Sequence, residues 1–332
     1  MSSKNFEPYQ ARIAEAVVRI LWRQWRVIGA AAAGDDARLI VDPEALILAS
    51  LIMSRREPRL DTTMADWLES GSTLISTQRL KNLADRFPQA ASARLGWVAG
   101  ISYHRGRDHR WRTLLDDTNR EEGSLPGPSA ERAKSAGPMV QRPAALLLRT
   151  RTAFGLSIKS DLIAVLHGSD FAEEMGSLIS TLGYRRNPTH LALRDLTAAG
   201  VVRGVRLPSG TGYTMARPLF TEERMAPWGW WNEVLGFLLA VTELEIPGPS
   251  ASEYARTVML RRAVEPRLGD LAHARLLHHD LQVPEDASSR RWMDFVIAVM
   301  DRASWREHHG AGAGSAVVPD GPDPGAVLLP LI

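Results

Sequence analysis

The sequence of 332 residues contains no cysteine. Disulfides, thiolate zinc sites and thiol nucleophiles are therefore excluded. Lysine is scarce as well, because only four of the 40 Lys and Arg residues are lysines, and we interpret this as a coding bias without functional meaning. The rest of the composition, 45% hydrophobic and 23% charged, is typical of a globular protein with a sizeable core.

Long apolar runs are also missing. The longest, residues 234–241, is too short to span a bilayer. The first ten residues, MSSKNFEPYQ, lack the hydrophobic segment of a signal peptide. We therefore expect a cytoplasmic protein without a membrane partner.

Recognisable catalytic motifs are absent from the sequence. It has no Walker loop, no GxGxxG after a predicted strand, no GxSxG and no HExxH. His273 lies five and six residues before His278 and His279, a spacing that does not place three ligands on one helical face. We therefore expect no enzyme activity, no catalytic residue, no metal site and no cofactor.

Apolar residues at helical spacing, with little strand pattern, predict a mainly α fold of two or three domains. We expect an all-α N-terminal domain over residues 1–120, a Gly-, Pro- and Ser-rich linker over 121–138, a central domain over 139–220, an all-α region over 221–305 and a disordered tail over 306–332. The N- and C-terminal helices fit either one body or two. Near the domain junction, Trp228, Trp230 and Trp231 favour core packing over an effector pocket.

The central domain contains the one pattern that indicates a function. Asn187 and Pro188 predict a helix over residues 187–199, with Asn187 as its N-cap and Pro188 at the first helical position. Helical spacing predicts one buried stripe, formed by Thr189, Ala192, Leu193 and Leu196. The outer side then carries His190, Leu191, Arg194 and Asp195.

Shorter elements flank this helix. A preceding helix is predicted over residues 171–182, where Asp170 and Glu173 have the spacing of a capping box. A short basic link, residues 183–186, joins the two helices. Residues 201–207 and 211–215 predict two strands of a β-hairpin, because residues 208–210, Pro-Ser-Gly, favour a turn.

A helix-turn-helix followed by a β-hairpin resembles the winged-helix transcriptional regulators of bacteria. The resemblance covers about residues 143–218 and rests on two sequence segments, LISTLGYRRNPTHLALRDLTAAGVV and RGVRLPSGTGYTM. It implies a central winged helix-turn-helix with one β-hairpin. The helical periodicity of the remaining sequence predicts all-α N- and C-terminal regions that flank it. The resemblance also implies that the second helix enters the DNA major groove and that the hairpin, or wing, touches the backbone. In this sequence Pro188 and Leu191 take positions that are often polar in such helices.

Charge distribution supports the same interpretation. The net charge is only +2, yet residues 139–220 hold ten Arg and Lys against five Asp and Glu. A local surplus of this kind favours contact with phosphates. The surplus is modest, and a second copy of the chain would double it.

The candidate DNA-contacting residues lie on the second helix and on the wing. Arginine can bind guanine through two hydrogen bonds and asparagine can bind adenine in the same way, whereas the wing residues favour phosphate contact. The alternatives are a solvated basic turn in which Asn187 only caps the helix, and an ordinary solvent-exposed hairpin. The full set is Tyr184, Arg185, Arg186, Asn187, Thr189, His190, Arg194, Arg203, Arg206, Ser209 and Thr211.

These observations lead us to expect a sequence-specific transcriptional regulator, acting as a dimeric repressor on double-stranded DNA. Dimerisation is expected because palindromic operators match a two-fold protein. The alternative is a protein-interaction module, since winged helices also bind proteins. Such a module resembles the antitoxins that carry a winged helix and neutralise a co-encoded protein.

Overall fold

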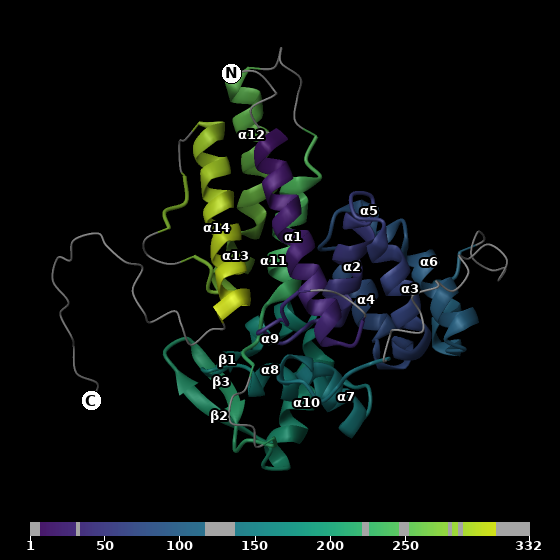
Figure 1. Ribbon diagram of the computed structural model, residues 1–332. Coiled ribbons are helices and arrows are strands. Elements are labelled where there is room, and N and C mark those ends of the chain that lie inside the picture. Colours follow the sequence, from purple (N-terminus) through teal and green to yellow (C-terminus); the bar gives the residue numbers. More distant parts are fainter. Residues whose placement is uncertain are drawn as a thin grey trace.

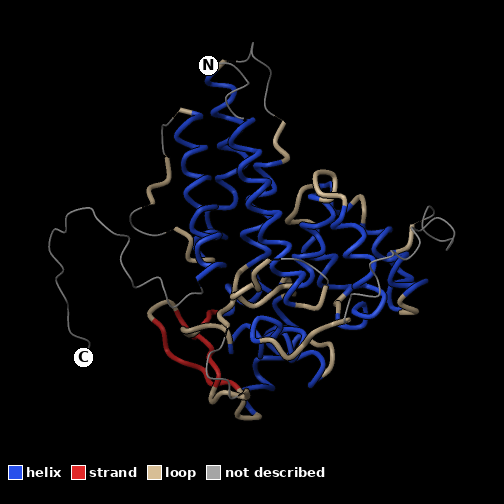
Figure 2. The backbone as a smooth tube through the Cα atoms, in the orientation of Figure 1, coloured by secondary structure: helices blue, strands red, loops and turns tan. Residues whose placement is uncertain are grey.

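The computed structural model describes residues 7–30, 34–116, 137–220, 226–245, 252–277, 281–284 and 288–309. Within this part the chain is mainly helical, as predicted, and contains a small antiparallel sheet of three strands. Figure 2 shows the strands together at one end of the molecule and helices through the remainder. Among the described helices, none combines the length and the hydropathy needed to cross a membrane.

Helix α2 (Pro43–Met53) is the centre of the N-terminal half, and every one of its residues is buried. Asp42 is its N-cap and accepts a hydrogen bond from the Ala45 amide, while Pro43 takes the first helical position, where no N–H is needed. Helices packed around α2 are α1 (Glu7–Val27), α3 (Arg59–Gly71), α4 (Thr77–Ala84), α5 (Gln89–Ser92) and α11 (Trp231–Thr242). Helix α6 (Leu95–Gly100) and the short turns Ile101–Arg105 and His109–Leu114 complete this half.

Helices from the two ends of the sequence form one bundle (Figure 1). Helix α1 packs against both α11 and α14 (Ser289–His309), and α14 packs against α12 (Glu253–Val264). A helical turn, Glu265–Arg267, and α13 (Leu268–His273) follow α12. The N- and C-terminal helical regions therefore share a core instead of forming two separate bodies.

The predicted boundaries differ in two places. Helix α14 runs through His309, so residues 306–309 of the predicted tail are helical, and residues 310–332 lie outside the described part. Most of the predicted linker, residues 117–136, is outside it too. The three tryptophans are buried as expected, and Trp231 donates its indole N–H to the carbonyl of Ile40 at 3.0 Å.

A buried network of charged side chains joins the N-terminal helices to the central segment. Arg79 of α4 donates to Asp42 and Glu44, each at 2.5 Å. Arg151 of α7 (Leu146–Phe154) donates to Glu44 at 2.7 Å and to Asp161 of α8 (Ile158–His167) at 2.7 Å. These five side chains have no exposed surface.

Each buried carboxylate in this network contacts an arginine, so none is an isolated charge. Burial alone would raise the pKa of Glu44, but Arg151 and Arg79 together lower it below its usual value. Removal of one charged side chain from this network would leave its partner charged and unpaired in the core. The central helices are thereby fixed to the N-terminal helices.

Candidate functional site

The site begins with two consecutive helices, α9 (Met175–Leu182) and α10 (Arg186–Ala198). They follow the helical turn Pro143–Ala145, α7 and α8. Figure 1 shows α10 and the sheet at the end of the molecule opposite the N-terminal ends of α12 and α14. Helix α10 therefore lies at the surface, away from the terminal bundle.

Gly183 produces the sharp turn between these helices. It adopts a left-handed conformation with φ 68°, which glycine tolerates best. A Cβ atom added to Gly183 would lie 2.7 Å from Cδ2 of Leu83, so close packing also favours glycine. Helix α4 holds the turn from the other side, because Arg79 Nε donates to the Leu182 carbonyl at 2.9 Å and Asn82 Nδ2 to the Gly183 carbonyl at 2.8 Å.

One side of α10 is buried and the other is exposed, as the spacing predicts. The buried stripe consists of Thr189, Ala192, Leu193 and Leu196. It packs against α8, α9 and strand β2 (Val202–Leu207). The outer side exposes Arg186, Asn187, His190, Leu191 and Arg194.

The predicted role of Asn187 as N-cap is wrong. The helix begins one residue earlier, with Arg185 as N-cap and without a capping side-chain hydrogen bond. Pro188 is the third helical residue and not, as predicted, the first, but its missing N–H costs no hydrogen bond there because it lies within the first turn. The amide of Asn187 is exposed and is not used as a cap, so capping and base contact do not compete for it.

The predicted capping box of the preceding helix is wrong as well. Glu173 and Glu174 form strand β1, and α9 starts only at Met175. Glu173 is buried and accepts a hydrogen bond from the Ser177 hydroxyl at 2.9 Å. The helix predicted to begin at residue 171 is therefore shorter, because residues 171–172 are not helical and Glu173 and Glu174 pair with β3.

The β-hairpin is present, and β1 extends it to three strands. Strands β2 and β3 (Gly210–Met215) pair antiparallel from Val202 opposite Met215 to Leu207 opposite Gly210. Strand β1 pairs with the other edge of β3, which gives the order β1-β3-β2. Gly212 permits this approach, since an added Cβ would lie 2.6 Å from Leu207 Cδ1 and 3.0 Å from the Ala172 side chain.

The two wing arginines lie on opposite faces of the sheet. Alternation along β2 separates Arg203 from Arg206. Arg206 is opposite Thr211 and therefore shares the face of Thr211 and Tyr213, whereas Arg203 is opposite Thr214 on the other face. Both arginines are exposed. Their side chains therefore leave the wing from opposite faces.

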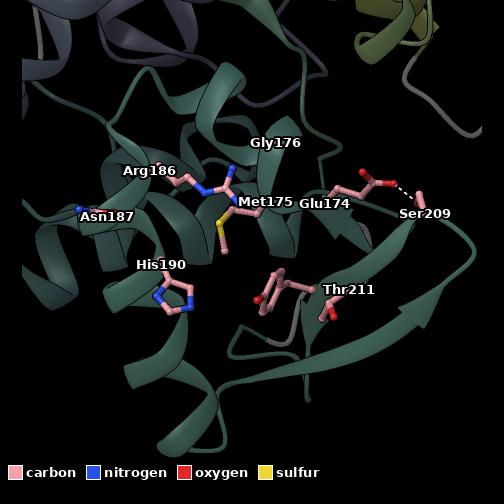
Figure 3. Close-up of a pocket in the computed structure, with 9 residues that line it drawn as sticks. Glu174, Met175, Gly176, Arg186, Asn187, His190, Ser209 and Thr211 are labelled. Carbon is pink, nitrogen blue, oxygen red and sulfur yellow. Dashed lines mark hydrogen bonds between the residues drawn. The ribbon is translucent and has the colours of Figure 1, made fainter.

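An open groove lies between α10 and the wing (Figure 3). Its volume is about 570 Å³. It is lined by the start of α9, the first turns of α10 and the wing: Glu174, Met175, Gly176, Arg186, Asn187, His190, Ser209, Thr211 and Tyr213. Ser209 donates its hydroxyl to the carboxylate of Glu174 across one end of the groove.

Five of the predicted DNA-contacting residues line this groove: Arg186, Asn187, His190, Ser209 and Thr211. Four more are exposed beside it or beyond it: Arg185, Arg194, Arg203 and Arg206. Of these, Arg194 contacts Asp195 at 3.3 Å, and Asp195 also pairs with Lys159 at 2.9 Å. The cationic charge on that part of α10 is therefore partly neutralised.

Two predicted residues have hydroxyl groups that are already hydrogen-bonded within the protein. Thr189 is fully buried, and its hydroxyl donates to the Arg185 carbonyl at 2.9 Å. Tyr184 donates its hydroxyl to Asp161 Oδ2 at 2.8 Å and so belongs to the buried charge network. Burial and the neighbouring Asp161 raise the pKa of Tyr184, which therefore remains a neutral donor.

Sequence patterns missed four residues that line the groove: Glu174, Met175, Gly176 and Tyr213. Tyr213 had a detectable signal, because it alternates with Thr211 along the predicted strand. The other three are placed by the unpredicted pairing of β1 with β3. Within the described residues, no group of three or more His, Asp or Glu side chains is arranged to hold a metal ion.

The site thus combines an exposed helix side, a three-stranded sheet and a polar groove between them, all packed on the helical body. No family model, no curated protein and no solved structure matches the chain.

Proposed function

We propose that this chain is a sequence-specific DNA-binding regulator with a winged helix-turn-helix, which acts in the cytoplasm as a homodimeric repressor. One observation supports the proposal above all others. The exposed side of α10, with Arg186, Asn187 and His190, lies next to a β-hairpin and is separated from it by a groove.

Dimensions of the helix suit the proposal. Helix α10 has 13 residues and is about 20 Å long at 1.5 Å per residue. The DNA major groove is about 12 Å wide and admits an α-helix. With the first turn of α10 in that groove, Arg186 and Asn187 would contact base edges, and the wing would contact the flanking backbone.

The hydrogen bonds that anchor the start of α10 support its proposed contact with base edges. The turn before α10 is hydrogen-bonded to Arg79 and Asn82 of α4, and Tyr184 is bonded to buried Asp161. A helix held in this way loses little conformational entropy when it binds. The arrangement favours binding by a preformed surface.

Selection of bound duplexes from a random-sequence library tests the proposal, with affinities then measured by fluorescence anisotropy. We expect an enriched sequence, and we expect Arg186→Ala to weaken its binding by about 1–3 kcal/mol if Arg186 contacts a guanine. Arg262→Ala in α12 is the matched control, because it removes an exposed arginine from the terminal bundle. Failure to enrich any sequence, or equal losses in both variants, would contradict the proposal.

A protein-interaction role is the second candidate, and Leu191 favours it. This side chain is 48% exposed in the middle of the outer side of α10. An exposed leucine there suits an apolar partner surface as well as a thymine methyl group. If a co-encoded protein copurifies with the parent and is lost in Leu191→Gln, while no duplex is enriched, the second candidate replaces the first.

A further inference from the structure

Glu174 introduces a negative charge into the groove that the proposed function assigns to DNA. Of the described residues that line the groove, Glu174 is the only carboxylate and Arg186 the only arginine. These two opposite charges cancel. The groove between α10 and the wing is therefore not a cationic channel, although the surrounding surface exposes Arg185 and Arg206.

The position of Glu174 gives it two separate contacts with the wing. Its backbone pairs with Gly212 of β3, and its carboxylate accepts the hydroxyl hydrogen of Ser209 in the turn of the wing. A hydroxyl has a single hydrogen to donate. While Ser209 is bonded to Glu174, it cannot donate to a phosphate.

These observations lead us to infer that Glu174 limits the affinity of the groove for the phosphate backbone. The inference rests on the proposed DNA-binding function. Glu174 acts by charge repulsion and by occupying the Ser209 hydroxyl. Backbone contacts alone are then too weak for stable binding, so base contacts by α10 decide which duplex is occupied.

A purely structural role for Glu174 predicts different behaviour. If its carboxylate serves only to hold the turn of the wing through Ser209, then its charge has no effect on binding. Glu174→Gln separates the two roles, because glutamine retains an oxygen that accepts from Ser209 and loses the charge. Glu174→Ala removes both the charge and the acceptor.

The test measures binding of the full chain to a random-sequence duplex by fluorescence anisotropy, at about 50 mM and about 200 mM salt. At the lower salt we expect Glu174→Gln to bind about three- to tenfold more tightly than the parent, since a like charge near a phosphate is removed. The gain should shrink at the higher salt, because screening weakens the repulsion. Glu15→Gln on α1 is the control for an equal charge change at an exposed site outside the groove.

The outcomes separate this inference from the proposed function. If the parent binds DNA and Glu174→Gln binds no better than the parent or than Glu15→Gln, the inference is overturned and the function stands. Occupation of the Ser209 hydroxyl predicts that Glu174→Ala, which frees this hydroxyl, binds at least as tightly as Glu174→Gln. If Glu174→Ala instead loses the gain of Glu174→Gln while its melting temperature is unchanged, that part of the inference is overturned and only the charge repulsion stands. If neither the parent nor Glu174→Gln binds any duplex, the proposed function fails, and the inference fails with it.

Discussion

Tyr184, which directly precedes the N-cap of α10, donates its hydroxyl to the buried carboxylate of Asp161 at 2.8 Å. Asp161 also accepts two hydrogen bonds from Arg151, and Arg151 in turn contacts Glu44 of α2. Tyr184 thus connects the start of α10 to the core of the N-terminal half. A residue that resembles a surface DNA contact in the sequence is a structural anchor in the fold.

Tyr184→Phe tests this anchor. The change removes one hydrogen bond to a buried carboxylate that retains its arginine, and we expect the free energy of unfolding to fall by about 1–2 kcal/mol. Urea denaturation measures it. Because Tyr184 does not face the groove, affinity for a selected duplex should change less than in Arg186→Ala. A Tyr184→Phe protein with parental stability and strongly reduced DNA affinity would assign Tyr184 to the ligand instead.

Arg79→Met tests the buried network as a whole. The methionine would leave Asp42 without an arginine partner and Glu44 with Arg151 alone. Unpaired buried charge costs about 3–5 kcal/mol, so we expect a large loss of stability or failure to fold. Arg12→Met is the control, because the Arg12–Asp301 pair has side chains 55% and 52% exposed. It should cost less than about 1 kcal/mol, and similar losses in the two variants would contradict a special role for the network.

Glycine substitutions test the turn between α9 and α10. In Gly183→Ala the alanine would have to adopt the left-handed conformation of the glycine, and its methyl group would lie 2.7 Å from the Leu83 side chain. Gly200 has the same φ of 68° but open space around an added Cβ. We expect Gly200→Ala to cost about 1 kcal/mol and Gly183→Ala clearly more, as judged by urea denaturation. Equal costs would mean that Leu83 yields without strain.

Several of these features were predictable because they depend on neighbours in the sequence. The buried stripe of α10 and the β2–β3 hairpin follow from periodicity and from the turn at residues 208–210, and both are confirmed. Strand β1 is not detectable, since a strand of two residues, Glu173–Glu174, has no pattern of its own and depends on pairing with β3. For the same reason the sequence gives no indication that Glu174 lines the groove.

Other errors came from local signals that tertiary contacts override. An Asn-Pro pair favours a helix start with Asn as the cap, yet α10 begins at Arg186, and Asn187 remains exposed. Tyr184 belongs to a basic link in the sequence, but its partner Asp161 is on α8. When the partner of a polar residue is distant in the sequence, the neighbouring residues give no pattern from which the contact could be predicted.

Buried Glu233 gives a prediction for the dependence of stability on pH. Burial raises the pKa of this carboxyl from 4.5 to about 8, with smaller effects from Arg86, Asp270 and Asp42. Between these pH values the unfolded chain releases the proton and the folded chain retains it, so rising pH favours unfolding. Stability should therefore fall from about pH 5 to about pH 8, by an amount on the order of 4 kcal/mol.

Glu233→Gln should remove most of this fall, as measured by urea denaturation at a series of pH values. Some of the fall should remain, because burial also raises the pKa of Glu307. Glu15→Gln, at an exposed site, should leave the fall unchanged. If the parent is equally stable at both ends of the range, Glu233 does not titrate as burial requires.

The central claim is that α10 enters the major groove of a preferred duplex. Methylation protection at guanine N7 tests it most directly, because N7 lies in the major groove. On the duplex selected from a random library, we predict protected guanines where the first turn of α10 binds, and loss of that protection in Arg186→Ala but not in Arg262→Ala. A bound duplex whose guanines all remain reactive would contradict the account.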